Sequence, residues 1–212
     1  MKTYYPCYDK LIAHLLTFLP DIDPRFRDLL WPLLSDPITA KKDIQILKPG
    51  EVAEYAYWPV TGFIRSYEIF KPKADSEATQ QKTISVSSPD KIALNADSFM
   101  NRNPSDCWME ISKGSTVVAF SYSSFKALMA LIPDVAILAL NIVSDADEDW
   151  KRRVKICQVQ GLSGYVKFLE TFIDVERYVF LEDISSCIGM TPQNLSKLRK
   201  RAGFSNEHLR KR

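Results

Sequence analysis

The chain has 212 residues, of which 46% are hydrophobic and 11% aromatic, a composition that is typical of a folded globular protein and excludes a disordered one. The 28 basic and 26 acidic residues nearly balance over the whole chain. Residues 1–150, however, carry a net charge of −5, whereas residues 151–212 carry +7. A polyanion would be repelled by the first part and attracted to the second, so the charge pattern favours a nucleic-acid partner for the C-terminal part.

The sequence has no signals for export, metal binding or catalysis. The start MKTYYPCYDK has no apolar signal-peptide core, and Lys126, Pro133 and Asp134 interrupt the most apolar stretch. The four cysteines are too far apart for a local zinc or iron–sulfur site, and neither of the two histidines has a neighbouring nucleophile. We therefore expect a cytoplasmic protein with no membrane partner, no cofactor, no metal site and no enzymatic activity.

The first part of the sequence combines two predicted helices with a series of short strands. Helical spacing of leucines and isoleucines predicts one helix that ends at Pro20 and a second helix after Asp23. The pattern then changes to short β-type runs separated by turn residues, which predicts a small antiparallel barrel, sandwich or roll. The predicted strands lie at about residues 44–46, 52–57, 63–69, 83–86, 91–94, 108–111 and 116–120, with an exposed hairpin loop at 71–82.

Residues 133–160 are predicted to form one long helix, about 42 Å in length if it is unbroken. A small domain cannot cover an apolar stripe of that length, and a symmetry-related copy of the chain is the simplest partner. Packing of the stripe on the same chain's own β-structure is the alternative. The residues predicted to make the dimer contact are Val135, Leu138, Ile142, Ala146, Trp150 and Val154.

Residues 181–201 have the pattern of two short helices around a glycine turn. Gly189 lies where the chain must reverse, and Thr191 and Pro192 are favoured as the N-cap and first residue of the second helix. The side chains expected to pack between the two helices are Ile184, Ile188, Leu195 and Leu198. The pattern predicts a helix-turn-helix, with an ordinary helical hairpin as the alternative.

The outward face of the second helix carries amides, hydroxyls and cations, which are the groups that contact base edges and phosphates in a major groove. Gln193 suits an adenine edge and Lys197 a guanine, whereas Ser196, Lys200 and Arg201 suit phosphates. The complete set of predicted DNA-binding residues is Thr191, Gln193, Asn194, Ser196, Lys197, Lys200 and Arg201.

Several motifs follow one another in a consistent order. Residues 62–67 read GFIRSY, Ser98-Phe99 is followed by Pro104-Ser105, and the C-terminal part contains IGMTP and LSKLR. Together with residues 162–169, these motifs resemble the Crp/Fnr family of transcription regulators over nearly the whole chain. The resemblance implies an α+β fold with an N-terminal antiparallel β-roll of the double-stranded β-helix or jelly-roll type, flanked by helices, then a long dimerisation helix and a C-terminal helix-turn-helix domain.

The region that corresponds to the effector site departs from the family members that bind cyclic AMP, which have a Gly-Glu pair and a phosphate-binding arginine. Residues 94–99 and 104–106 contain neither, and Asp97 and Asp106 would repel a phosphate. Arg102 is out of register for this role. We therefore expect that the roll does not bind cyclic AMP in the usual way and holds another ligand or none. The pocket residues that the resemblance implies are Asn95, Asp97, Ser98, Phe99 and Ser105.

The predicted domains are a sensor roll at 1–132, a dimerisation helix at 133–160 and a DNA-binding domain at 161–212. The predicted function is a homodimeric, sequence-specific transcription regulator whose partners are double-stranded DNA, a second copy of the chain, an unknown small-molecule effector and RNA polymerase. The alternative is a ligand-binding or protein-interaction module whose helix-turn-helix no longer binds DNA. After Arg201 only eleven residues remain, too few for the β-hairpin wing and anchoring strand that often follow such a motif.

Overall fold

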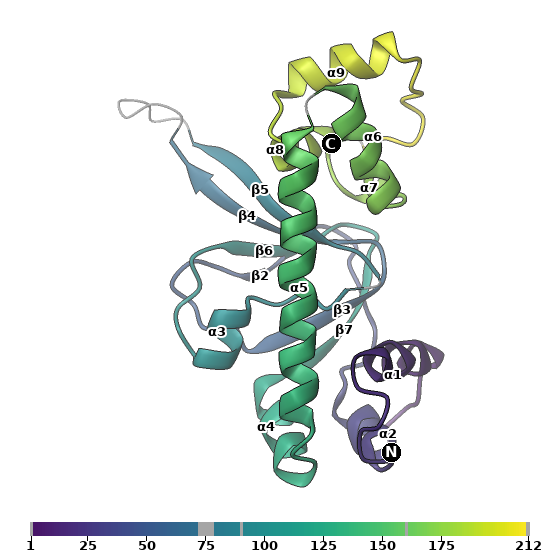
Figure 1. Cartoon of the computed structure of the whole chain (residues 1–212), viewed down its shortest axis with the longest axis vertical. Coiled ribbons are helices and arrows are strands. Elements are labelled where there is room, and N and C mark those ends of the chain that lie inside the picture. The colour runs from purple at the N-terminus through teal and green to yellow at the C-terminus, as the bar shows by residue number, and fades with distance from the viewer. Residues whose placement is uncertain (1, 72–78, 90, 160, 211–212) are drawn as a thin grey trace.

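The computed structural model describes residues 2–71, 79–89, 91–159 and 161–210. A long helix runs the length of the molecule, with the N-terminal helices and a β-roll beside it and a group of short helices at its far end (Figure 1). The helices are α1 (Pro6–Phe18), α2 (Phe26–Leu30), α3 (Ala96–Asn101), α4 (Tyr122–Leu131), α5 (Val135–Gln158), α6 (Leu162–Thr171), α7 (Val175–Tyr178), α8 (Leu181–Cys187) and α9 (Pro192–Arg201), with a 3₁₀ turn, η1, at Trp31–Leu33.

The roll consists of two antiparallel sheets, in the orders β1-β7-β3 and β2-β6-β4-β5. The strands are β1 (Ile38–Thr39), β2 (Ile44–Leu47), β3 (Tyr55–Thr61), β4 (Ile64–Phe70), β5 (Gln80–Ser87), β6 (Trp108–Ile111) and β7 (Thr116–Ser121). The chain passes from one sheet to the other at Gly62, which has a φ of +77°. A Cβ at this position would lie 2.7 Å from the Cβ of Ser115, so only glycine allows this close crossing.

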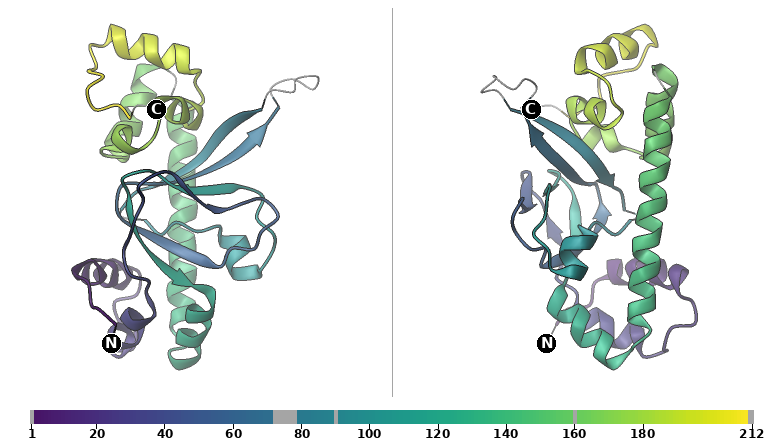
Figure 2. Two further views of the ribbon diagram at one scale, coloured as in Figure 1. Left: turned by 180° about the vertical axis from the view of Figure 1, so that it is seen from behind. Right: turned by 60° about the vertical axis from the view of Figure 1, so that its left-hand side comes forward.

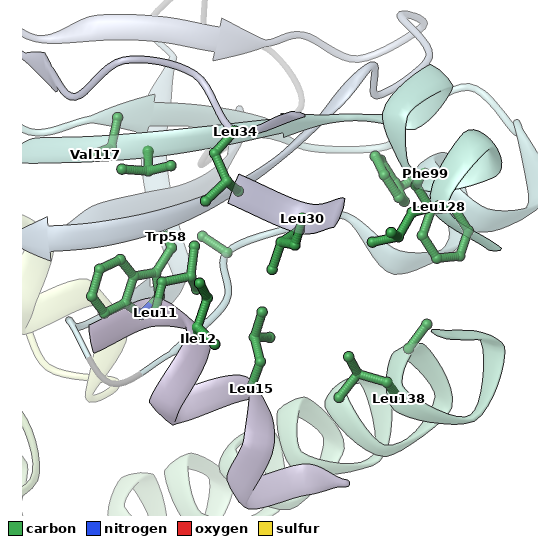
Figure 3. Close-up of a cluster of buried hydrophobic side chains, with 14 of the residues drawn as sticks. Leu11, Ile12, Leu15, Leu30, Leu34, Trp58, Phe99, Val117, Leu128 and Leu138 are labelled. Carbon is green, nitrogen blue, oxygen red and sulfur yellow. The ribbon is translucent and has the colours of Figure 1, made fainter. Parts of the chain in front are cut away.

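A first hydrophobic core lies between the roll and the helices that cover it. Leu11 and Leu15 of α1, Leu30 of α2, Trp58 of β3 and Leu138 of α5 point toward one another in this core (Figure 3). The first part of α5 is therefore fixed to the roll by the N-terminal helices.

A second core holds the C-terminal helices together and reaches back into the roll. Ile156 of α5 and Phe168 of α6 belong to it, and so do Phe63 and Val86 of the roll. The C-terminal helices thus pack both on the end of α5 and on the four-stranded sheet, as the two further views show (Figure 2).

The element order and the α+β class agree with the sequence prediction, and a few details differ. Residues 91–94 form no strand; Ala93 makes only an isolated bridge to Tyr57. The long helix has 24 residues and ends at Gln158, earlier than predicted. Most of the predicted hairpin loop, residues 72–78, lies outside the described residues. No helix in the described ranges is both long and apolar enough to cross a membrane.

Candidate nucleic-acid interface

The turn between α8 and α9 has the geometry that the sequence predicted. Gly189 has a φ of +73°, a conformation that glycine adopts without the steric cost of a side chain. The hydroxyl of Thr191 accepts a hydrogen bond of 3.2 Å from the backbone N–H of Asn194, and Pro192 is the first residue of α9. The start of α9 is therefore set by three adjacent sequence signals.

Apolar side chains fix the angle between the two helices. Ile184 and Ile188 are buried against Leu195, and all three belong to the second core. Leu198, the fourth residue predicted to pack here, is only half-buried and does not belong to this core. Because α8 and α9 are packed on each other and on α6, the outward face of α9 is held as a rigid surface.

This outward face carries the predicted DNA-contacting side chains. All seven of them are exposed, namely Thr191, Gln193, Asn194, Ser196, Lys197, Lys200 and Arg201. The helix contains no acidic residue, so the cations on this face have no carboxylate of the same helix beside them. A surface of amides and cations on a protruding helix (Figure 1) can contact both base edges and phosphates.

Arg199 is a cation of α9 that does not belong to this surface. It is buried, its side chain pairs with Glu176 and the hydroxyl of Tyr165, and its Nη2 donates a 2.7 Å hydrogen bond to the backbone oxygen of Ser205. No role was predicted for Arg199 from the sequence. Its position four residues after Leu195 places it on the same, inward-facing side of the helix, and that spacing could have identified it as structural.

A polar network joins the C-terminal helices to the roll. Arg65 of β4 is buried and pairs with Asp183 of α8, while its Nε donates a 3.0 Å hydrogen bond to Glu110. Its other nitrogens reach Thr83 at 3.3 Å and Gln81 at 2.7 Å. Burial raises the pKa of Asp183 to about 6, despite the opposing effect of Arg65. The position of the helix-turn-helix relative to the roll thus depends on a buried charge cluster.

The segment after α9 adds a second connection. It returns to the roll, where Arg210 pairs with both carboxylate oxygens of Asp43 at 2.6 Å and its backbone N–H donates to the oxygen of Glu176 at 2.7 Å. Residues 202–210 contain no strand.

The predicted dimer residues are divided between two environments. Val135 and Leu138 are buried in the first core of their own chain, and Ile142 is half-buried beside them. Trp150 and Val154, in contrast, are 48% and 37% exposed. Ala146 is also exposed, although it borders a cavity against the roll. The early half of the predicted stripe is thus covered by other side chains of the first core of the same chain.

The apolar residues of α5 that remain exposed lie on a neighbouring face. Leu140 is 69% exposed and Val143 is half-buried, and with Trp150 and Val154 they follow spacings of three, seven and four residues. These spacings keep the side chains on one face, as in a helix that packs against a parallel partner. Asp147 interrupts this stripe and pairs with Lys151 at 2.7 Å.

The predicted effector-pocket residues around α3 are engaged in holding the local backbone. Asn95 caps α3 by accepting from the N–H of Ser98 at 3.0 Å, and it donates to Ser105 at 3.1 Å. The hydroxyl of Ser98 accepts from the N–H of Ala53 at 2.8 Å. The exposed Asp97 accepts hydrogen bonds from Asn101 and Asn103.

Phe99, another member of the predicted pocket, borders a cavity. This cavity, of about 90 Å³, lies in the first core and is lined by apolar side chains. Arg102 is held by the backbone oxygen of Ala53 at 2.7 Å and by Glu54, so it is not directed toward a phosphate site. In the described part of the chain, no three side chains of the metal-binding types lie close enough to share an ion.

Comparison with known proteins identifies the fold. No family model and no curated protein sequence matches the chain. Among solved structures, FixK2 from Bradyrhizobium japonicum is 18% identical with a TM-score of 0.60, and the match covers 84% of this chain and 93% of FixK2. A candidate cAMP-binding regulatory protein from Silicibacter pomeroyi DSS-3 is 17% identical with a TM-score of 0.63, over 95% of this chain and 92% of that one.

A third structure, DNR from Pseudomonas aeruginosa, is 17% identical with a TM-score of 0.50, over 95% of this chain and 89% of DNR. These matches include the roll, the long helix and the C-terminal helices, because they extend over nearly all of each chain. At these identities they establish a common architecture rather than a common ligand or target. The chain has the fold of the Crp/Fnr transcription regulators, as its motifs predicted.

Proposed function

We propose that the chain is a transcription regulator that binds specific double-stranded DNA as a homodimer, with α9 as the recognition helix. The observation that carries the proposal is the face of α9, where every predicted contact residue is exposed on a helix-turn-helix whose other face is packed. Lys197 and Gln193 are assigned to base edges, and Lys200 and Arg201 to phosphates. A contact with RNA polymerase stays a prediction.

The homodimer would form through the exposed stripe of α5. This stripe is defined by Leu140, Val143, Trp150 and Val154, and it lies on a helix whose opposite side is fixed to the roll. A twofold axis along α5 would present two copies of α9, and such dimers bind half-sites about one helical turn, or roughly 34 Å, apart.

The proposal is tested by selecting bound sequences from random duplex DNA with the purified protein. We expect enrichment of a sequence with twofold symmetry, and affinity that falls steeply with salt because phosphate contacts release counterions. Recovery of no enriched sequence, together with no salt-dependent binding, would instead favour a ligand-binding module without a DNA function.

A further inference from the structure

A second cavity, of about 210 Å³, lies between the roll and α5. Side chains of β4, β5 and β6 line it on one side, and α5 lines it on the other. Phe172, which follows α6, also lines the cavity, so the cavity touches the roll, the long helix and the C-terminal unit. Unlike the apolar cavity of the first core, it contains charged and hydroxyl groups.

Arg153 of α5 is a half-buried cation in this cavity, and no described carboxylate pairs with it. Its guanidinium stacks on Trp150 at 4.1 Å, and its Nη1 reaches the sulfur of Cys187 at 3.8 Å. Burial raises the pKa of Cys187 to about 11, so this thiol is neutral at neutral pH and does not balance the charge. The buried Nε of Arg153 has no hydrogen-bond partner among the described residues. A guanidinium whose buried Nε–H has no acceptor can donate a hydrogen bond to an anion.

Lys91, the other cation of the cavity, is already neutralised. Its ammonium lies 2.8 Å from Asp145 and 2.9 Å from Asp149, both on α5. Two carboxylates for one lysine leave a net negative charge at this end of the cavity. A ligand with a single negative charge is therefore favoured over a dianion such as a phosphate monoester.

Three serine hydroxyls face the same space from neighbouring strands. Ser66 of β4 and Ser85 and Ser87 of β5 line the cavity, and none of these hydroxyls has a hydrogen bond to another described residue. The remaining wall includes Met109 and Ile142 and is apolar. The cavity thus offers one anion-binding group, several hydroxyls and an apolar wall to one small molecule.

We propose that this cavity binds a small monocarboxylate with a compact apolar body, and that this molecule is the effector of the regulator. Only the role of this molecule as an effector rests on the proposed function; the binding site does not. The carboxylate would take the free edge of the Arg153 guanidinium, and the body would lie against Met109 and Ile142. Pockets for drug-sized ligands occupy about 300–1,000 Å³, so this volume suits a single ring or a short chain rather than a nucleotide.

Occupation of the cavity would affect the position of the DNA-binding unit. Arg153 contacts Cys187, the last residue of α8, and Phe172 belongs to the same unit. A carboxylate that draws the guanidinium into the cavity changes the contacts of α8 with α5. The ligand therefore couples to DNA affinity through side chains that already join the two parts.

The test uses the full chain and isothermal titration calorimetry with phenylacetate as the probe. Phenylacetamide has the same shape without the charge, and we expect it to bind at least about tenfold more weakly than phenylacetate. Arg153→Met should weaken phenylacetate binding by a similar factor. Arg152→Met is the matched control, because Arg152 is 59% exposed on the same helix, pairs with Asp149 and does not line the cavity; it should bind the probe like the parent.

Equal binding of acid and amide by the parent would overturn the proposal, and so would an Arg153→Met variant that binds phenylacetate like the parent. Absence of phenylacetate binding would also overturn it. So would displacement of phenylacetate by cyclic AMP, if the Arg153→Met substitution leaves phenylacetate binding unchanged. The acid–amide comparison needs no variant, so a folding defect in Arg153→Met leaves the proposal testable. DNA binding is measured separately: a parent that binds phenylacetate but no duplex refutes the proposed function and leaves the ligand site standing.

Discussion

Arg65 of β4 and Asp183 of α8 form a buried ion pair between residues that are 118 positions apart in the sequence. The pair connects the roll to the first helix of the helix-turn-helix. Glu110 shares the guanidinium, at 2.9 Å from Nη2, so one arginine balances two buried carboxylates. The orientation of the helix-turn-helix on the roll is therefore coupled to the charge state of this cluster.

Removal of the arginine should be strongly destabilising. Arg65→Met leaves Asp183 and Glu110 buried without their cation, and loss of one partner from such a pair costs about 3–5 kcal/mol. Urea unfolding should show this loss in the free energy of unfolding. The control is Arg27→Met, because Arg27 is 58% exposed in its pair with Asp9 and its loss should leave the urea midpoint nearly unchanged. If Arg65→Met is as stable as the control, the cluster does not hold the two parts together.

The same cluster should make stability depend on pH. Burial raises the pKa of Asp183 from 3.8 to about 6, so the folded protein binds this proton more tightly than the unfolded chain does. The stabilisation is complete below about pH 3.8 and is lost as the pH rises through about 6. Burial raises the pKa of Glu110 as well, which acts in the same direction.

Comparison with Asp183→Asn isolates this contribution, because Asn does not titrate. The free energy of unfolding of the parent, relative to that of Asp183→Asn, should be greater at pH 5 than at pH 7.5, by about 1.4 kcal/mol. Urea unfolding of both proteins at the two pH values measures this difference. A relative stability that is unchanged or smaller at pH 5 would contradict the raised pKa.

Local sequence signals were sufficient to predict the helix-turn-helix. Gly189, Thr191 and Pro192 each act through the backbone of the turn itself, so their effect does not depend on distant residues. The short strands and their turn residues likewise predicted the roll, because an alternating pattern and glycine turns are properties of adjacent residues. The α+β order could therefore be derived without tertiary information.

Residues whose roles depend on tertiary contacts could not be assigned in this way. The periodicity of α5 shows which residues share a face, but not which face the roll will cover, and this is why Leu138 is in the core whereas Leu140 is exposed. The partners of Arg65 and Arg199 come from other elements of the fold. Likewise, the resemblance implied that Asn95 and Ser98 line a pocket, whereas in the structure Asn95 caps α3 and the hydroxyl of Ser98 accepts a hydrogen bond from Ala53.

Dimerisation should depend on the exposed face of α5. Leu140→Lys places a charge on a position that is 69% exposed in the single chain, so the variant should fold normally and lose only the contact between copies. Leu131→Lys is the control, because Leu131 is 56% exposed at the end of α4 and does not lie on α5. Sedimentation equilibrium should give twice the chain mass of 24.2 kDa for the parent and the control, and the single mass for Leu140→Lys. A parent that sediments as a monomer, or a Leu140→Lys variant that stays dimeric, would exclude a dimer contact through the exposed stripe of α5.

The two lysines of α9 should have different effects on DNA binding. Lys197→Ala should reduce discrimination at one base pair of the selected site by about 1–3 kcal/mol, because it removes a base-edge contact. Lys200→Ala should weaken binding to all duplexes about equally and reduce the steepness of the salt dependence, because it removes a phosphate contact. Lys167→Ala is the control, an exposed lysine of the C-terminal unit that lies on α6 rather than α9. Fluorescence anisotropy with the selected duplex and single-base variants, at several salt concentrations, separates the two effects. If Lys197→Ala and Lys200→Ala both bind like Lys167→Ala, DNA does not contact this face of α9.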